Sequence, residues 1–187
     1  MKNVNFVLGG LGGQGILFLT KVLAQAALDK GHKVTGAETH GMAQRGGSVV
    51  SHLRLGDVEG SLVRAGTADY LLALEENEAY RNIPFLAKGG RVYANASPVS
   101  FPREEARGYL ERSEILCRSV KAGEMASELG VPMSSNLVLL GFFAAYEDDP
   151  LTPDDLRGTV EKLSPDRFRE INIVAFDAGL RMGLEER

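Results

Sequence analysis

A glycine run near the N-terminus constrains the fold more than any other feature of this sequence. Residues 9–15 read Gly-Gly-Leu-Gly-Gly-Gln-Gly and follow the short apolar run Val4 to Leu8. From Gln14 the apolar residues recur at helical spacing, and Gly31 supplies a left-handed stop. An unbroken apolar run is typical of a strand buried on both faces. The chain therefore begins as strand, glycine turn and helix.

Short apolar runs and helical patterns go on alternating along the chain. We expect strands at 4–8, 33–38, 49–55, 70–74, 91–95 and 115–120, and helices at 14–30, 75–87, 122–129 and 134–146, followed by two that begin near 152 and 164. Pro84 is expected to break its helix, and 97–112 to form an irregular or short helical connection. This order predicts α/β architecture: a three-layer α/β/α single domain, residues 1–187, on a largely parallel, Rossmann-like sheet.

The last third of the chain carries the most apolar helix. We expect Ser134 to cap it, Gly141 to allow close approach of a neighbour, and its apolar part, 137–146, to belong to a subunit interface. Thr152 and Ser164 each precede a proline, which favours an N-cap at both positions. The final helix is expected to present one apolar face made of Phe168, Ile171, Ala175, Ala178 and Met182.

Composition removes several function classes. The 187 residues carry a net charge of −4, which gives no electrostatic reason to expect nucleic acid or an anionic membrane as partner. Cys117 is the single cysteine, so a disulfide framework is excluded and any iron–sulfur cluster belongs on another chain. No apolar stretch reaches the roughly 18 residues of a membrane span. Because the N-terminus enters a strand at once, we expect a cytoplasmic protein.

The glycine run also matches a ligand-binding pattern. Gly10, Gly12 and Gly15 satisfy G-x-G-x-x-G, and Gly13 and Gln14 complete a candidate cofactor-binding turn. Glycine permits the tight turn and lets the backbone approach a diphosphate, while free N–H groups and the helix dipole favour negative charge. The alternative is that these glycines only pack the helix close to the sheet.

A second polar, glycine-rich segment follows the expected second strand. Residues 40–48 read His-Gly-Met-Ala-Gln-Arg-Gly-Gly-Ser, at the sheet edge where doubly wound folds bind ligands. His40, Gln44 and Arg45 are candidate binding residues, and the turn at Gly46 and Gly47 is a candidate anion-binding nest. For Arg45 taken alone, an ordinary surface salt bridge is the favoured interpretation. No metal is expected, because no carboxylate or thiol stands at ligand spacing with a histidine.

Together, segments 9–15 and 40–54 resemble the small, gamma-type subunit of 2-oxoacid:ferredoxin oxidoreductases, especially the beta subunit of the indolepyruvate enzymes. The strand at 69–74 and the Ser-Ser-Asn at 134–136 that opens the apolar helix extend the resemblance over nearly the whole chain. It implies a subunit of an enzyme that oxidatively decarboxylates a 2-oxo acid, passes electrons to ferredoxin and forms an acyl-coenzyme A. Aryl pyruvates such as indolepyruvate are the implied substrates.

The same resemblance implies that this chain binds no cofactor by itself and is inactive alone. Thiamine diphosphate, Mg²⁺ and the iron–sulfur clusters are expected on the partner subunit or subunits, in a heteromer that is itself dimerised. The two glycine-rich segments are then expected to meet, to face the partner and to place Arg45 near the active-site mouth, where the diphosphate of coenzyme A docks.

Two other classes of function stay open at this point. One is a noncatalytic structural or regulatory binding module. The other is an NAD(P)-dependent oxidoreductase that uses the G-x-G-x-x-G turn and takes Glu38, at the end of the next strand, for the ribose. The latter lacks an obvious catalytic Tyr-Lys or His-Asp pair.

Overall fold

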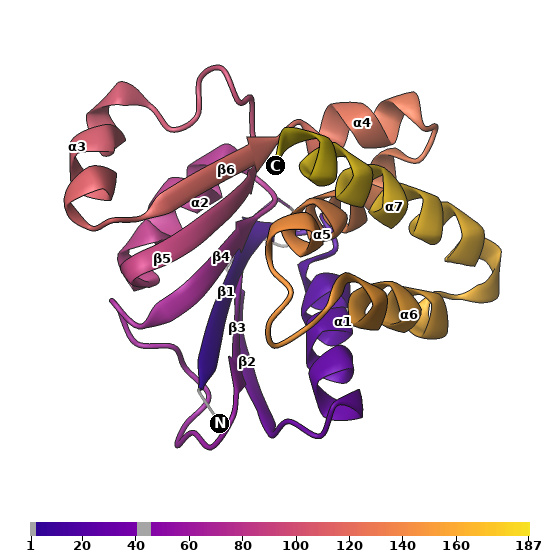
Figure 1. The fold of residues 1–187 in the computed structure, drawn as a ribbon, viewed down its shortest axis with the longest axis horizontal. Coiled ribbons are helices and arrows are strands. Elements are labelled where there is room, and N and C mark those ends of the chain that lie inside the picture. The colour runs from indigo at the N-terminus through magenta and orange to yellow at the C-terminus, as the bar shows by residue number, and fades with distance from the viewer. Residues whose placement is uncertain (1–2, 41–45) are drawn as a thin grey trace.

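In the computed structural model, which describes residues 3–40 (backbone only at His40) and 46–187, one sheet lies between two helical layers (Figure 1). Its strands are β1 (Val4–Leu11), β2 (Val34–His40), β3 (Ser48–Leu55), β4 (Ala68–Ala73), β5 (Leu86–Asn95) and β6 (Leu116–Val120), in the order β2-β3-β1-β4-β5-β6. β1, β4, β5 and β6 are parallel neighbours. The prediction of a largely parallel α/β sheet is confirmed.

β3 is the strand that runs against the others. It lies between β2 and β1 and is antiparallel to both, so β2 points in the same direction as β1 without touching it. The connection 41–47 explains this, because a parallel crossover needs about a dozen residues or more. As a result, the end of β1, the end of β2 and the start of β3 all lie at one edge of the sheet.

The helices divide unequally between the two faces. They are α1 (Ile16–Asp29), α2 (Glu76–Asn82), α3 (Glu104–Arg112), α4 (Ala122–Glu128), α5 (Ser135–Tyr146), α6 (Pro153–Leu163) and α7 (Arg169–Glu186), with 3₁₀ turns η1 (Ile83–Phe85), η2 (Pro132–Ser134) and η3 (Asp166–Phe168). α2 and α3 cover one face, and the other five helices lie on the opposite side (Figure 1). Side chains alternate accordingly: Phe6 and Leu8 of β1 enter the larger apolar cluster, and Val7 enters the smaller one.

Helix ends follow the sequence signals only in part. α2 stops at Asn82, and Pro84 lies in η1, because proline cannot continue the helical hydrogen bonds; residues 86–87 belong to β5 rather than to the expected helix. Thr152 is the expected N-cap and accepts from the Asp155 amide. Ser134 occupies the N-cap position of α5, as expected, but its side chain makes no capping hydrogen bond; Ser164 is not an N-cap, and that prediction is wrong. Their hydroxyls instead bond the side chain of Asn172.

α5 is covered by its own domain, so the expectation that it forms a subunit interface is wrong. Residues 136–145 are all buried. α7 crosses α5 so closely that a Cβ on Gly141 would overlap the carbonyl oxygen of Phe176, and one on Gly179 would overlap that of Val138. The close approach expected at Gly141 is confirmed.

The buried face of α7 also differs from the expected one. It is made of Ala175, Phe176, Gly179 and Gly183, because the glycines admit the backbone of α5. Phe168 lies in η3 rather than in the final helix, and both Phe168 and Ile171, assigned to the expected apolar face, are exposed, by 44% and 40%. Within the described residues, no helix combines the length and the apolar character that crossing a membrane requires.

Candidate functional site

The two glycine-rich segments meet at the edge of the sheet. The amide of Gly12 donates to the carbonyl of Gly47 across 2.9 Å, and a Cβ on Gly12 would lie 3.6 Å from the nitrogen of Gly46. Gly10 and the backbone of His40 lie at the same level of the sheet, each paired in register with Val49 of β3. The structure therefore brings together both segments, as expected. The side chain of His40, and all of Gln44 and Arg45, lie outside the described residues.

The first segment, which we call the first glycine loop (residues 9–15), is closed by its own groups. The Gln14 side chain accepts from the Leu11 amide through Oε1 at 2.8 Å, and the Gln14 amide donates to the Leu11 carbonyl at 3.1 Å. A Cβ on Gly10 would lie 2.9 Å from that Oε1. Gln14 thus shapes the turn, and Gly10 gives its side chain room.

Gly15 holds the first glycine loop against α5. It is the left-handed N-cap of α1, with φ 79°. Its carbonyl accepts from Asn136 Nδ2 at 3.2 Å, and a Cβ at this position would lie 2.5 Å from the same nitrogen. Asn136 is buried, and its Oδ1 accepts from the Leu137 amide. Residue patterns alone assigned no role to the Asn136 side chain. The one sequence feature that could have indicated this contact is a polar amide at the start of a run of apolar residues.

Two backbone amides of this loop have no acceptor among residues 3–40 and 46–187, namely those of Gly13 and Gly15. They stand before the N-terminus of α1, whose dipole favours negative charge or a carbonyl oxygen. The arrangement offers hydrogen-bond donors and a rigid backbone. The described part of the loop contributes no general acid, base or nucleophile.

A buried carboxylate anchors the start of β3. Glu78 of α2 is 1% exposed, accepts from Ser48 Oγ at 2.7 Å and pairs with Arg81 at 2.8 Å. Ser48 follows Gly47 directly, so the contact fixes where the second segment enters the sheet. Sequence reasoning missed Glu78, because one carboxylate in a short charged helix carries no distinguishing pattern.

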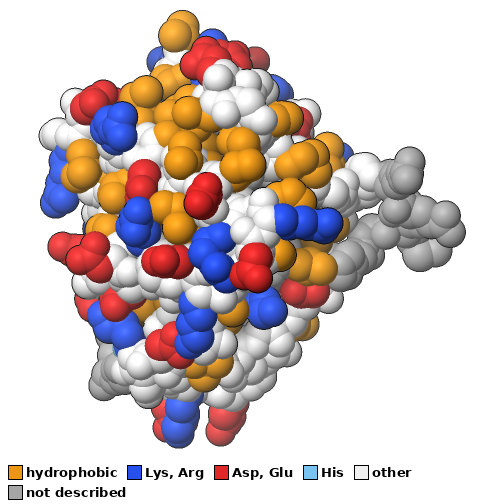
Figure 2. All heavy atoms as spheres, turned by 90° about the vertical axis from the view of Figure 1, so that its right-hand side faces the viewer, with side chains coloured by type: hydrophobic (Ala, Val, Ile, Leu, Met, Phe, Trp, Pro, Cys, Tyr) orange, Lys and Arg blue, Asp and Glu red, His pale blue; other side chains and the backbone are white. Residues whose placement is uncertain are grey.

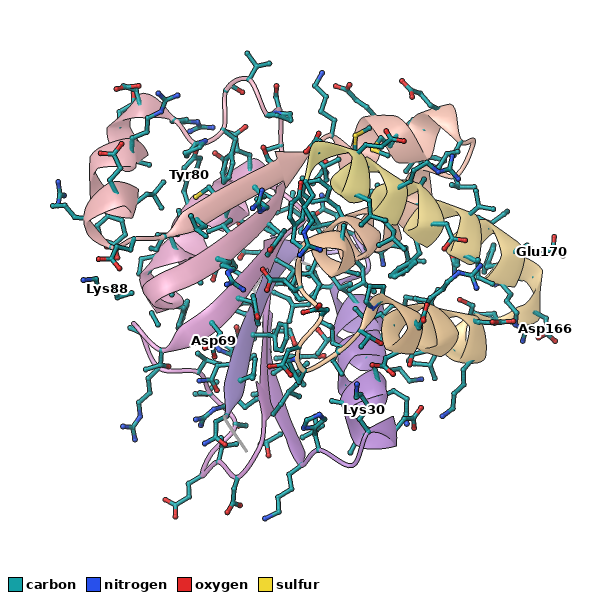
Figure 3. All side chains as sticks on the ribbon, viewed as in Figure 1. Lys30, Asp69, Tyr80, Lys88, Asp166 and Glu170 are labelled. Atoms are coloured by element: carbon teal, nitrogen blue, oxygen red, sulfur yellow. The ribbon has the colours of Figure 1, made fainter. Side chains whose placement is uncertain are left out.

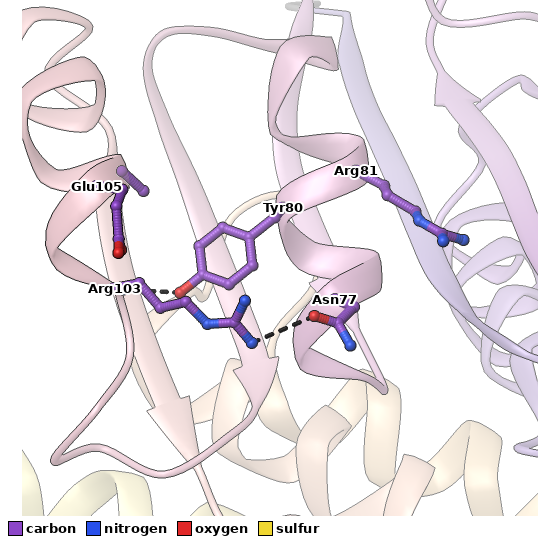
Figure 4. Close-up of a pocket in the computed structure, with 6 residues that line it drawn as sticks. Asn77, Tyr80, Arg81, Arg103 and Glu105 are labelled. Carbon is purple, nitrogen blue, oxygen red and sulfur yellow. Dashed lines mark hydrogen bonds between the residues drawn. The ribbon is translucent and has the colours of Figure 1, made fainter.

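A cavity of about 500 Å³ opens between α2 and α3 (Figure 4). Its cations are already neutralised: Arg103 bonds Glu76 and Asn77, while Arg81 pairs with Glu78. The Arg103 backbone amide donates to the Tyr80 hydroxyl at 2.7 Å, and burial raises the pKa of that phenol. Both arginines that line this cavity are thus already paired with carboxylates.

Two apolar hollows flank the first glycine loop on the α1 side. One, of about 280 Å³, extends to α5 and η3; the other, of about 420 Å³, extends along the start of α1 toward β3. Both are bordered by Gly13, Gly15 and Phe18, and no charged side chain of the described residues lines either one. A diphosphate would find amides here but no cation.

The described residues also fit neither a cluster nor a nicotinamide cofactor. They contain no group of three His, Cys, Asp or Glu placed to hold a metal, and burial raises the pKa of Cys117 to about 11, against the thiolate that a cluster requires. His52 accepts from the Val63 amide and, with its pKa lowered by burial, serves as a core residue. Glu38 lies on β2, the edge strand of the sheet. Because β3 lies between β2 and β1, Glu38 is two strand spacings, about 10 Å, from the strand that leads into the first glycine loop.

Comparison with known proteins identifies the family. The model of the pyruvate ferredoxin/flavodoxin oxidoreductase family matches residues 5–182. The chain belongs to this family. It is similar to indolepyruvate oxidoreductase subunit IorB of Pyrococcus horikoshii, with 35% identity over 198 residues, covering 99% of this chain and 98% of the relative. It is a small subunit of the 2-oxoacid:ferredoxin oxidoreductase type, and the resemblance read from the two glycine segments is confirmed.

Two further members of the oxidoreductase family define the extent of the match. The keto/oxoacid ferredoxin oxidoreductase gamma subunit of Geobacter sulfurreducens has the same fold, with a TM-score of 0.78 at 22% identity, covering 97% of this chain and 99% of the other. Ketoisovalerate oxidoreductase subunit VorA of Methanothermobacter marburgensis is 26% identical over 185 residues. The match covers 95% of this chain but only 36% of VorA. In VorA, therefore, the equivalent segment is joined to a much longer chain.

Proposed function

We propose that this chain is the non-redox subunit of an oxidoreductase that decarboxylates indolepyruvate or another aryl pyruvate to its acyl-coenzyme A, with ferredoxin as electron acceptor. The observation that carries the proposal is end-to-end similarity to an IorB subunit at 35% identity, against 26% to the ketoisovalerate subunit VorA. The whole of residues 1–187 acts as one gamma-type domain in this assignment. Substrate selection lies mainly on the partner.

The partner subunit carries thiamine diphosphate, Mg²⁺ and the iron–sulfur clusters, and it passes electrons to ferredoxin. Support comes from the single, high-pKa cysteine of this chain, which cannot ligate a cluster alone. The complex is a dimerised heteromer located in the cytoplasm.

The two glycine segments face the partner at the mouth of its active site. Gly12 and Gly47 tie the segments together, and the amides of Gly13 and Gly15 supply donors. His40, Gln44 and Arg45, with the Gly46–Gly47 turn, complete this region, and Arg45 holds the diphosphate of coenzyme A. Support comes from the meeting of both segments at Gly12 and Gly47, and from the position of Arg45 in the sequence directly before the Gly46–Gly47 turn.

Anaerobic affinity purification from the native host tests the assignment. We expect a stoichiometric, cysteine-rich partner and viologen reduction that depends on aryl pyruvates more than on pyruvate or 2-oxoglutarate. Activity that persists after this chain is removed would favour a structural or regulatory module. Recovery of the chain alone, with NADH bound, would favour the free dehydrogenase.

The role of Arg45 is tested in the assembled enzyme by Arg45→Ala. We expect the KM for coenzyme A to rise by about tenfold or more while assembly is retained, because a charge-assisted hydrogen bond is lost. Arg64→Ala is the matched control, since Arg64 is exposed in the loop before β4. Unchanged assembly, turnover and KM in Arg45→Ala would exclude the role.

A further inference from the structure

Exposed apolar side chains surround the first glycine loop. Met133 of η2 is 77% exposed, Leu17 of α1 is 48% exposed and Phe168 of η3 is 44% exposed. With Phe18, they border the two hollows described above, and we call these four residues the apolar rim. Figure 2 shows the face formed by α6 and α7, where apolar side chains gather in the upper half, on the side of α7 and α4. The four rim residues line two hollows that share Gly13, Gly15 and Phe18, and exposed apolar side chains grouped in this way mark an interaction site.

Charged residues border the apolar rim, and one of them covers part of it. Asp166 of η3 and Glu170 of the first turn of α7 lie at the outer edge of the molecule (Figure 3), and Asp166 pairs with Arg169. The Arg167 guanidinium stacks 4.5 Å from the centre of the Phe168 ring. An apolar centre with a polar border is the usual anatomy of a protein interface.

We propose that the apolar rim docks an apolar segment of the large oxidoreductase subunit. The inference deepens the proposed function, on which it rests, by assigning the partner to specific residues. Its occupant follows from the comparison of lengths. The equivalent of this chain makes up only 36% of VorA, where it is covalently joined to the remaining part of that protein. A separate chain needs a non-covalent surface to hold the corresponding part, and the rim supplies one.

Other occupants fit this surface less well. A phosphorylated ligand requires cations, and no charged side chain of the described residues lines the hollows. A second copy of this chain would enclose Gly13 and Gly15, which border both hollows, and so remove them from the enzyme's active-site mouth. A partner segment in the hollows keeps the first glycine loop beside the partner.

Site-specific photocrosslinking in the assembled enzyme tests the docking. With p-benzoylphenylalanine at position 133, irradiation of the purified complex is expected to join this chain to the large subunit. Position 99 is the control, because Val99 is 92% exposed in the connection between β5 and α3 and lines neither hollow. An adduct between two copies of this chain at position 133, or an equal yield at both positions, would overturn the proposal.

A double variant measures how much the apolar rim contributes to binding of the large subunit. Met133→Ser with Phe168→Ser is expected to weaken association with the large subunit by at least about tenfold, and Val99→Ser to leave it unchanged. Circular dichroism of each isolated variant establishes that the fold is intact. If the wild-type complex is active and the double variant assembles equally well, the docking site is wrong and the proposed function stands. If the wild-type chain has no partner, the proposed function itself fails.

Discussion

Single side chains decide how tightly the first glycine loop is held. Gly15 combines a left-handed backbone with a neighbour, Asn136, that leaves no room for a Cβ, so both the turn and its contact with α5 require glycine here. Gly12 is a glycine for a different reason. A Cβ there would make only ordinary contacts with Gly46 and Gly47, so the close backbone pairing of the two segments, and not backbone strain, accounts for glycine at this position.

We expect Gly15→Ala to lower the free energy of unfolding by about 2–4 kcal/mol, the sum of left-handed strain and a disturbed Asn136 contact. Gly31→Ala is the control, because Gly31 has φ 82° but open space around it, which leaves strain of about 1–2 kcal/mol alone. Urea unfolding measures both. Equal losses would show that the Asn136 contact contributes nothing.

At the scale of elements, the packing of α5 against α7 depends on glycines in both helices. The crossing of α5 and α7 brings backbone against backbone at Gly141 and Gly179, and it covers one side of the buried helix α5. Gly179→Ala is expected to cost about 3 kcal/mol or more, since the added methyl has no space. In contrast, Gly158→Ala on α6 meets no atom and is expected to stabilise by about 0.5–1 kcal/mol. Thermal unfolding of the two variants with the same sign would contradict this account.

The start of α6 gives an acid-dependent prediction. Burial raises the pKa of Asp155, but hydrogen bonds from Lys30 and Thr152 outweigh it, and the pKa falls to about 2. Because the folded value is below the ordinary 3.8, this stabilisation is complete above pH 3.8 and is lost as pH falls through about 2.

Asp155→Asn is therefore expected to cost about 1 kcal/mol at pH 7 and progressively less below pH 4. Asp154→Asn, an exposed neighbour in the same turn, is the control. Urea titrations at several pH values measure the difference, and a cost for Asp155→Asn that stays constant with pH would refute the assignment.

At the scale of the whole molecule, one buried carboxylate links two strands of the sheet to the segment that follows α5. Glu147, just after α5, accepts hydrogen bonds from Tyr70 of β4 and from Tyr93 and Arg91 of β5. Burial, with the negative charge of Glu147, raises the pKa of both phenols. Each phenol is thus neutral in the folded state at a pH where the unfolded chain ionises it, so stability falls as pH rises above about 10.

We expect the variant with both Tyr70→Phe and Tyr93→Phe to lose part of this alkaline decline, while Tyr109→Phe, at an exposed position on α3, keeps all of it. The measurement is urea unfolding between pH 8 and 11. Identical slopes in the wild type and the double variant would mean that other groups govern the alkaline limit.

The sequence predicts the order of elements well, because each depends on local signals such as the glycine run and Pro84. The meeting of the two glycine segments was also predictable, since strand ends share an edge. The parts that pattern reasoning missed depend on distant neighbours. Glu78 is buried where it contacts Ser48. The glycines of α7 pack against the backbone of α5, and this contact determines which side of α7 stays exposed.

The proposed docking of the apolar rim on the large subunit has a consequence for how the protein is made. A chain synthesised in excess of its partner keeps Met133 and Phe168 in water, where self-association competes with assembly. Mass action then links the survival of each orphan copy to the supply of the other subunit. The proposed docking therefore requires that the two polypeptides be produced in balanced amounts.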